Sequence, residues 1–257
     1  FHTSADLSGD PYANDITRLV IEAKVDVPDN TGDLTVVVEH WKSYYLDEDE
    51  FRRAIESYRV AQAIDDLDTD TDACVVMGDV NEEIDDVPGY PNPFTSIPDD
   101  LPYSYQLGDD LQALLAGPGI ENDPFWYLQR SAGPGLIALD AFHLDGSVVT
   151  RPASSRRLDY LFVSRAVDDL GPQTEVYDSS DEGLPGGLPK QGSALASGTC
   201  ALATDHLPVF ADITVGVTTC TTDADCDDGV FCNGTEQCNA GTCQPGTPVD
   251  CDDDIDC

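Results

Sequence analysis

Most of the chain alternates between short apolar runs and polar segments. Five apolar runs of strand length are predicted to form β-strands, at residues 16–25, 34–40, 73–79, 157–163 and 207–214. Two segments instead show helical periodicity, 47–67 and 109–117. In the first, apolar side chains recur every three or four residues and acids gather at the start, where they suit the positive end of the helix dipole. Strands that alternate with helices predict an α/β domain.

Loop segments and a change of composition complete this organisation. Residues 85–107 and 179–199 are rich in Pro, Asp, Gly and Ser and are predicted to be surface loops. The composition changes near residue 216, after which Lys and Arg are absent and seven cysteines follow. We therefore predict an α/β domain over 1–216 and a Cys/Asp-rich region over 217–257. In that region CDDGVFC (226–232) recurs as CDDDIDC (251–257), which is typical of a repeat array.

The charge balance restricts the partners. The chain has 50 Asp and Glu residues against 12 Lys and Arg, a net charge of −38. Nucleic-acid backbones are bound through Lys and Arg, so we expect only weak nucleic-acid binding. A solvated, halophile-like acidic surface is the simpler interpretation of the charge. No apolar run approaches the roughly 20 residues of a membrane-spanning helix, so no membrane span is predicted.

The cysteines point to an oxidising compartment. Seven of the nine lie between Cys220 and Cys257, in a segment with too few apolar residues for a core. Such spacing favours disulfides, and zinc is disfavoured because the segment has no C-x-x-C pair and no His. We therefore predict an extracellular protein, secreted or at the cell surface. Seven cysteines cannot all pair among themselves, so one must pair with Cys200, Cys74 or another chain, or stay free. We expect this one to be Cys257, paired beyond the last residue.

Four motifs at the predicted strand ends carry candidate chemistry. They are VVVEHWKS (36–43), VVMGDVNE (75–82), RRLDYLFVS (156–164) and ATDHLPVFAD (203–212). Each alone has an ordinary structural explanation, such as a turn or a strand terminus. Together they supply two histidines, three aspartates and an asparagine at strand ends, where α/β folds bind ligands. These residue types suit phosphoester hydrolysis, which needs a carboxylate for a metal and a base held in one tautomer.

The order H-x-K-S, G-D-x-N, R-L-D-Y and T-D-H-x-P-V resembles the endonuclease/exonuclease/phosphatase (DNase I-like) superfamily over residues 15–214. The resemblance implies a four-layer α/β-sandwich and Mg²⁺-dependent hydrolysis of a phosphoester. It implies that His40 contacts the scissile phosphate and that Asp79 and Asn81 position water and phosphate. It further implies that Asp205 is a carboxylate at the metal, that His206 is the general base or a phosphate-stabilising histidine, and that Asp159 orients it.

One part of the family pattern has no counterpart in this sequence. Members of the family begin with about a hundred further residues, including a strand that ends in Asn and a Gln-Glu motif whose Glu binds the metal. No segment before Ile16 supplies either, and Glu22 and Glu39 do not follow a Gln. We therefore expect the N-terminal part of the fold, and with it one metal ligand, to be missing from this chain.

The acidic tail resembles cysteine-rich extracellular repeats. Asp223, Asp225 and Asp227 precede Gly229 at a spacing similar to that of calcium loops, although the register and the twelfth-position Glu of an EF-hand are absent. Calcium binding and simple solvated acidity both remain open interpretations, as does self-assembly or a surface partner through the tail. For the whole chain, two functions compete: a secreted metal-dependent phosphoester hydrolase of unknown substrate, and an extracellular structural or adhesive protein that uses the fold as a scaffold.

Overall fold

A computed structural model describes residues 1–27, 33–84, 93–190, 193–213, 220–226, 237–239 and 242–244. The chain divides into two compact units. The first comprises Phe1–Ala23 and Thr35–Ile213, and the second comprises Lys24–Leu34 and Thr214–Cys257. Each unit is described separately below.

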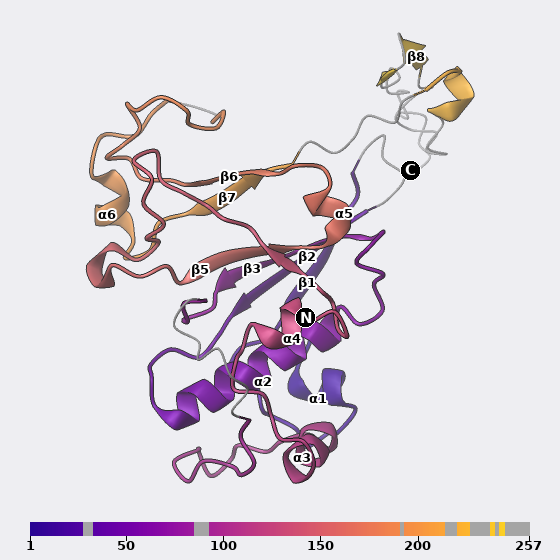
Figure 1. The fold of residues 1–257 in the computed structure, drawn as a ribbon, viewed down its shortest axis with the longest axis vertical. Helices are drawn as coiled ribbons and strands as arrows, with labels where there is room; N and C mark the ends of the chain where they lie inside the picture. Colours follow the sequence, from indigo (N-terminus) through magenta and orange to yellow (C-terminus); the bar gives the residue numbers. More distant parts are fainter. Residues whose placement is uncertain are drawn as a thin grey trace, which may run out of the picture. The chain divides into compact units, whose positions relative to one another are not determined.

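A five-stranded mixed sheet forms the centre of the fold, in the spatial order β1-β2-β3-β5-β4 (Figure 1). Its strands are β1 (Ile21–Val25), β2 (Leu34–His40), β3 (Ala73–Asp79), β4 (Ile137–Ala138) and β5 (Asp159–Val163). Strand β5 runs antiparallel to both β3 and β4. The backbone N–H of Trp41 donates to the carbonyl of Asp79, so β2 and β3 end side by side at the same edge of the sheet.

Helices cover one face of this sheet (Figure 1). They are α1 (Ser4–Ser8), α2 (Asp47–Ala63), α3 (Asp109–Ala116) and α4 (Trp126–Gln129). The main hydrophobic core lies between these helices and the strands, and it includes Phe51 and Ile55 of α2 with Val76 of β3 and Phe162 of β5. Side chains alternate along each strand, so neighbouring positions such as Val75 and Leu161 point to the opposite face.

A smaller sheet contributes the next layer. It pairs β6 (Gln173–Val176) antiparallel with β7 (Val209–Asp212). A second hydrophobic cluster joins Val176, Ala141, Leu207 and Cys200. The short helices α5 (Arg165–Asp168) and α6 (Thr199–Ala203) lie in the connections around this sheet. None of the described helices has the length and apolar character needed to cross a bilayer.

The α/β class and most long elements agree with the sequence prediction. Strands 34–40 and 73–79 have the predicted bounds, and the predicted helix 47–67 is present as α2. It ends at Ala63, four residues early, because Asp65 and Asp66 would place negative charge at the negative end of the helix dipole. The predicted strand 16–25 is formed only from Ile21, and residues 85–92 of the predicted loop lie outside the described residues.

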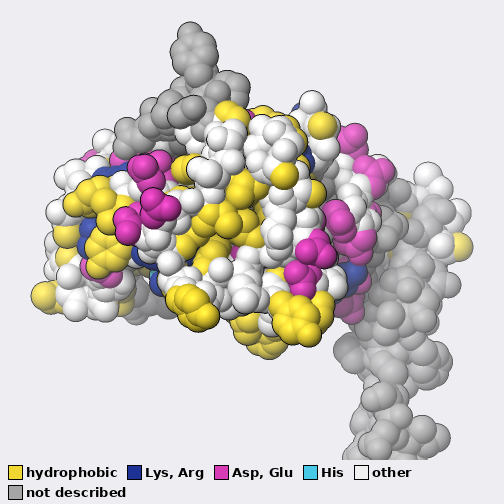
Figure 2. Space-filling model, turned by 90° about the horizontal axis from the view of Figure 1, so that it is seen from below, with side chains coloured by type: hydrophobic (Ala, Val, Ile, Leu, Met, Phe, Trp, Pro, Cys, Tyr) yellow, Lys and Arg dark blue, Asp and Glu magenta, His cyan; other side chains and the backbone are white. Residues whose placement is uncertain are grey.

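The acidic composition reaches the surface of the first unit. Figure 2 shows Asp and Glu side chains in several separate groups on the face seen from below, with few Lys and Arg among them. Large hydrophobic side chains are also exposed in this unit, including Tyr12 and Tyr103.

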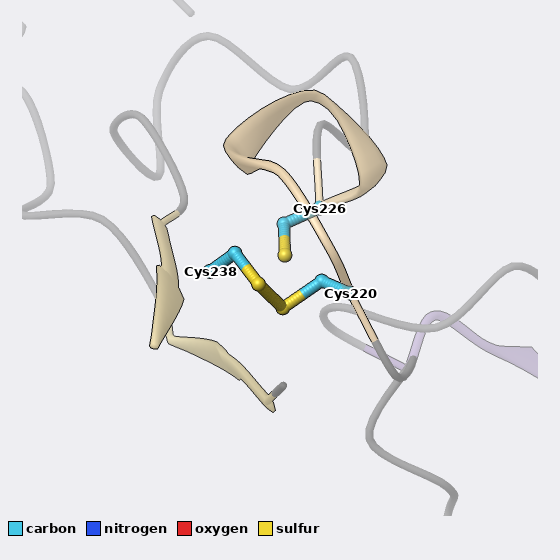
Figure 3. A group of neighbouring side chains, drawn as sticks. All are labelled: Cys220, Cys226 and Cys238. Carbon is cyan, nitrogen blue, oxygen red and sulfur yellow. A yellow bond between two sulfur atoms is a disulfide. The ribbon is translucent and has the colours of Figure 1, made fainter. Parts of the chain in front are cut away.

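The second unit contains a disulfide. Cys220 is bonded to Cys238, and Cys226 lies beside this bond and is itself disulfide-bonded (Figure 3). The hairpin β8 (Gln237–Asn239) and β9 (Thr242–Gln244) carries Cys238, and the turn η2 (Asp223–Asp225) packs nearby. The predicted disulfide is therefore confirmed for this part of the tail, whereas Cys257 lies outside the described residues.

The two cysteines outside the tail belong to the first unit and are not disulfide-bonded. Cys74 and Cys200 are buried free thiols. Burial raises the pKa of the Cys74 thiol to about 12, which keeps it in the unreactive protonated form.

Candidate active site

The predicted catalytic residues line a single pocket of about 830 Å³. It contains all six positions that the four motifs supplied: His40, Asp79, Asn81, Asp159, Asp205 and His206. They come from the ends of β2, β3 and β5 and from the segment between α6 and β7. The predicted convergence of these side chains is therefore observed.

Strand register explains why the two aspartates meet. In the antiparallel ladder of β3 and β5, Asp79 is directly opposite Asp159. Both share a sheet face with Val75 and Leu161, the face that points away from the core helices. On the neighbouring strand β2, the same alternation directs His40 into the pocket while the preceding residue, Glu39, is buried.

His206 is paired with Asp159. Its Nδ1 lies 2.8 Å from Oδ2 of Asp159, and both side chains are about four-fifths buried. A carboxylate can only accept here, so Nδ1 carries a proton, and the neutral tautomer that this bond selects has its lone pair on Nε2, toward the pocket. Nε2 lies 3.8 Å from Oδ2 of Asp79. The pair has the geometry of a base held in one tautomer by a carboxylate.

A buried threonine holds both members of this pair in place. The Oγ1 of Thr150 accepts hydrogen bonds from the backbone N–H groups of Leu158 and Asp159, at 2.9 and 3.1 Å. Its carbonyl accepts from the N–H of Leu207, the residue that follows His206. One residue therefore fixes the start of β5 to the segment that carries the imidazole. This role could not be predicted from the sequence, because a threonine in a loop is not distinctive.

Asp79 lies between the two histidines. Its Oδ1 accepts the backbone N–H of Asn81 at 3.0 Å, and its Oδ2 lies 3.5 Å from Nε2 of His40. Burial, with the nearby charge of Asp159, raises the pKa of Asp79. Burial, with the guanidinium of Arg18, lowers the pKa of His40, so His40 is neutral at pH 7. The two opposed carboxylates thus have no protonated imidazole at His40 to balance them.

Asn81 has a conformation suited to the tight turn after β3. Its φ is +53°, in the left-handed region that asparagine tolerates better than most residues. Its side-chain Nδ2 donates to the carbonyl of Trp41 at 3.0 Å, which leaves its Oδ1 as the free end of the amide. Gly78, the first residue of the G-D-x-N motif, has φ +156°. A Cβ added to it would lie 1.9 Å from the carbonyl oxygen of Glu39. The G-D-x-N motif is therefore required locally by the backbone as well.

Three arginines also line the pocket: Arg18, Arg151 and Arg156. Arg18 donates to the carbonyls of His40 and Trp41, and Arg156 forms an ion pair with Glu83 at 2.7 Å. None of the three is singled out by a motif or pattern in the sequence. Fold topology brings them together, and sequence spacing carries no signal of it.

Two tyrosines stand at the rim of the pocket and were also missed. The side chains of Tyr44 and Tyr45 are 72% and 79% exposed, so both rings are open to solvent beside the pocket. Tyr44 has φ +79°, a strained value for a residue with a side chain, and Lys42 lies over its ring. Strain of this kind concentrates at functional sites.

Three residues of the pocket place their ligand atoms close enough to share a metal ion. Ligand atoms of Asp79, Asp159 and His206 all lie within 4.8 Å of one another. Asp205 is outside this group: its side chain is 68% exposed and faces the guanidinium of Arg151 at 3.4 Å. In this structure Asp205 is thus a rim residue beside an arginine.

The structure describes part of the tail segment in which calcium-binding aspartates are predicted. Asp223 accepts a hydrogen bond from the backbone N–H of Cys238. Asp225 lies in the same 3₁₀ turn, and Asp227 is outside the described residues.

Glu39 and Glu22 occupy positions unlike a metal ligand of the pocket. Glu22 pairs with His2 at 2.7 Å, and neither glutamate lines the pocket. Glu39 is 5% exposed, and neither of its carboxyl oxygens has a hydrogen-bond partner among the described residues. Burial, with the nearby Glu56, raises the pKa of Glu39 well above its usual range.

Comparisons with known proteins do not place the chain in a family. A scan against protein-family models finds no match, and neither does a search of curated proteins.

Proposed function

We propose that the protein is a secreted, metal-dependent phosphoester hydrolase of the endonuclease/exonuclease/phosphatase type, with a DNase I-like α/β-sandwich. The observation that carries the proposal is the pairing of His206 with Asp159, in a pocket that also holds Asp79 and His40. The layered arrangement of the five-stranded sheet, its helices and the β6–β7 sheet is compatible with such a sandwich.

The pocket fits a hard divalent ion such as Mg²⁺. Asp79 and Asp159 present two opposed carboxylates, and the raised pKa of Asp79 reflects burial and their mutual repulsion. Carboxylate oxygens are the donors that Mg²⁺ prefers, so these two residues would hold it. When bound, the ion would neutralise charge on the phosphate. His206 fits less well as a ligand for this ion because it offers an imidazole nitrogen, whereas Mg²⁺ prefers oxygen donors.

The protein's own groups provide the acid–base chemistry. His206 would take a proton from the attacking water through Nε2, and Asp159 would stabilise the resulting imidazolium. Asn81 would orient water or phosphate through its free Oδ1. His40, neutral at pH 7, would donate a hydrogen bond to a phosphate oxygen as charge develops there.

The pocket favours a small phosphoester over a long polyanion. Arg18, Arg151 and Arg156 supply positive charge within a chain whose net charge is −38. Such a balance permits one phosphate group in the pocket and opposes an extended nucleic-acid backbone. The exposed rings of Tyr44 and Tyr45 would suit a planar leaving group by stacking.

The test is hydrolysis of bis(p-nitrophenyl) phosphate and p-nitrophenyl phosphate in Mg²⁺, Mn²⁺ and EDTA. We expect metal-dependent release of nitrophenolate that falls by about 10²–10⁴-fold in His206→Asn, the range for loss of a general base. His2→Asn is the matched control, because His2 pairs with Glu22 and does not line the pocket.

Equal activity in the His206 and His2 variants would refute the assigned base. Absence of both hydrolysis and phosphate binding in the wild-type protein would instead favour the non-catalytic, extracellular scaffold. The disulfide of the tail is compatible with either outcome.

A further inference from the structure

A second histidine–carboxylate cluster, separate from the pocket residues, lies between two loops of the first unit. Its members are His143, Asp145 and Asp181, and ligand atoms of the three lie within 4.8 Å of one another. His143 and Asp145 belong to a tight turn after β4, in which the His143 N–H donates to the Ser147 carbonyl and the Gly146 N–H donates to the His143 carbonyl. Asp181 belongs to the loop that follows β6. None of the three lines the candidate active site.

The imidazole of His143 is held in one tautomer with its free nitrogen inside the cluster. Its side chain is only 8% exposed, and Nε2 lies 2.6 Å from the carbonyl oxygen of Val149. A carbonyl only accepts, so Nε2 carries the proton and Nδ1 bears a lone pair. Nδ1 faces Oδ2 of Asp181 at 4.0 Å, too far for a hydrogen bond. A histidine that donates its other N–H to a backbone carbonyl is the usual arrangement of a metal ligand.

The two carboxylates are oriented by backbone groups and keep lone pairs for a further partner. Oδ2 of Asp181 accepts the N–H of Leu144 at 2.8 Å, and Oδ1 of Asp145 accepts the N–H of Ser147 at 2.9 Å. In the part of the chain that the structure describes, no Lys or Arg forms an ion pair with either carboxylate. The two carboxylates therefore face the His143 ring without a Lys or Arg partner among the described residues.

We propose that His143, Asp145 and Asp181 bind a divalent transition-metal ion of the zinc class. One imidazole nitrogen and two carboxylate oxygens are donors that zinc accepts at about 2.0–2.2 Å, with water completing the coordination. The imidazole disfavours Mg²⁺ and Ca²⁺, which prefer oxygen donors alone. Separations up to 4.8 Å between ligand atoms close around such an ion with small side-chain rotations.

The bound ion would join the turn after β4 to the loop after β6. The carbonyl that holds His143 belongs to Val149, and the next residue, Thr150, supports both Asp159 and Leu207. The site would therefore stabilise the segment that supports the candidate active site. It does not depend on the proposed hydrolase function, because metal binding is measured directly.

The test is calorimetric titration of the chelator-treated, oxidised protein with Zn²⁺ alone, in 0.15 M salt to screen diffuse binding to the acidic surface. The parent protein and all variants carry Asp79→Asn and His206→Asn, so that the cluster of Asp79, Asp159 and His206 does not contribute. We expect one tight equivalent that is lost in His143→Gln and weakened at least about 10-fold in Asp145→Asn and Asp181→Asn. Asp169→Asn removes the same charge at an exposed position and should bind as the parent does.

Thermal unfolding provides a second measurement. Zn²⁺ should raise the unfolding temperature of the parent and of Asp169→Asn, and raise that of Asp145→Asn much less. The Asp145→Asn variant should fold, because its amide oxygen can still accept the Ser147 N–H. This variant keeps the test decisive if His143→Gln does not fold. Unchanged zinc affinity in both aspartate variants, or tighter binding of Ca²⁺ than of Zn²⁺, would overturn the proposal.

Discussion

Nδ1 of His206 and Oδ2 of Asp159 lie 2.8 Å apart, although 47 residues separate them in the sequence. Asp159 is the first residue of β5 in the five-stranded sheet, and His206 precedes β7 of the smaller sheet. The hydrogen bond therefore joins the two sheets of the first unit at the candidate active site. Its geometry depends on how these sheets pack, so the chemistry and the fold are linked at this point.

Asp79→Asn should stabilise the protein while abolishing hydrolysis. Asp79 faces Asp159 across the ladder, and an amide removes this repulsion while still accepting the Asn81 N–H. Like charges opposite each other on a sheet cost on the order of 0.5–1 kcal/mol. Because the folded pKa of Asp79 is raised, its stabilising contribution is complete below its unfolded pKa and is lost at higher pH.

The measurement is urea unfolding of both proteins at pH 7 and at pH 3. The variant should be more stable at pH 7, and the difference should vanish at pH 3, where the wild-type carboxyl is protonated. Asp169→Asn, an exposed site, is the control for net charge. A variant less stable than wild type at pH 7 would contradict this account.

Hydrophobic periodicity was sufficient to predict the elements that bury a face. Strands β2 and β3 and helix α2 were predictable because their apolar positions repeat with the period of the structure they form. Strand β6 was missed because its sequence, QTEV, has four residues and no clear alternation. Elements as short as β4 and α5 are determined by the tertiary contacts around them, which local sequence does not encode.

The candidate site was predictable where its residues follow strands and unpredictable where loops supply them. His40 and Asp79 lie at the ends of apolar runs, a position visible in the sequence. Arg18 and Tyr45 enter the pocket from segments with no such pattern. The cluster around His143 depends on two loops that are close only in the folded chain.

Arg151 and Asp205 face each other, so substitutions of the two residues should change phosphate binding in opposite directions. The two side chains are exposed and 3.4 Å apart, a weak ion pair in which Asp205 competes with an incoming anion. Arg151→Gln should weaken binding of inorganic phosphate by about 10-fold, equivalent to one charge-assisted hydrogen bond, and Asp205→Asn should strengthen it. Titration calorimetry measures both, with Arg165→Gln on α5 as an exposed control.

If Asp205 is instead a metal ligand, as the family resemblance implies, its variant will behave differently. Asp205→Asn would then weaken phosphate binding in Mg²⁺ and have no such effect in EDTA. Equal affinities for wild type and Arg151→Gln would remove this arginine from the binding site.

The buried ion pair of α2 should be a major determinant of stability. Arg59 and Asp15 are both fully buried, with Nη2 and Oδ2 2.5 Å apart, and Asp110 accepts from the same guanidinium. Removing one partner leaves an uncompensated buried charge, so Asp15→Asn or Arg59→Gln should cost about 3–5 kcal/mol in the free energy of unfolding. Arg165→Gln breaks an exposed pair and should cost less than about 1 kcal/mol. Chemical denaturation would distinguish these values, and similar losses at both sites would refute the argument.

Glu39 should make the protein less stable as the pH rises. This carboxyl is buried close to Glu56, and no hydrogen bond from the described residues reaches either of its oxygens. Burial therefore raises the pKa of Glu39 well above its usual range, so the folded protein holds the proton that the unfolded chain releases. The stabilising contribution is complete below the unfolded pKa and is lost as the pH rises through the folded pKa.

Glu39→Gln has nearly the same shape and cannot ionise. The variant should match the wild type in stability near pH 4 and exceed it increasingly at higher pH, by up to about 1.4 kcal/mol per pH unit for one proton. Urea unfolding at pH 4, 6 and 8 measures this difference, and Glu48→Gln, on the first turn of α2, should keep the wild-type pH profile. If the difference in stability between Glu39→Gln and wild type did not change with pH, Glu39 would be ionised in the folded protein. An ionised Glu39 would need a buried cation beside it, directly behind His40 and the candidate active site.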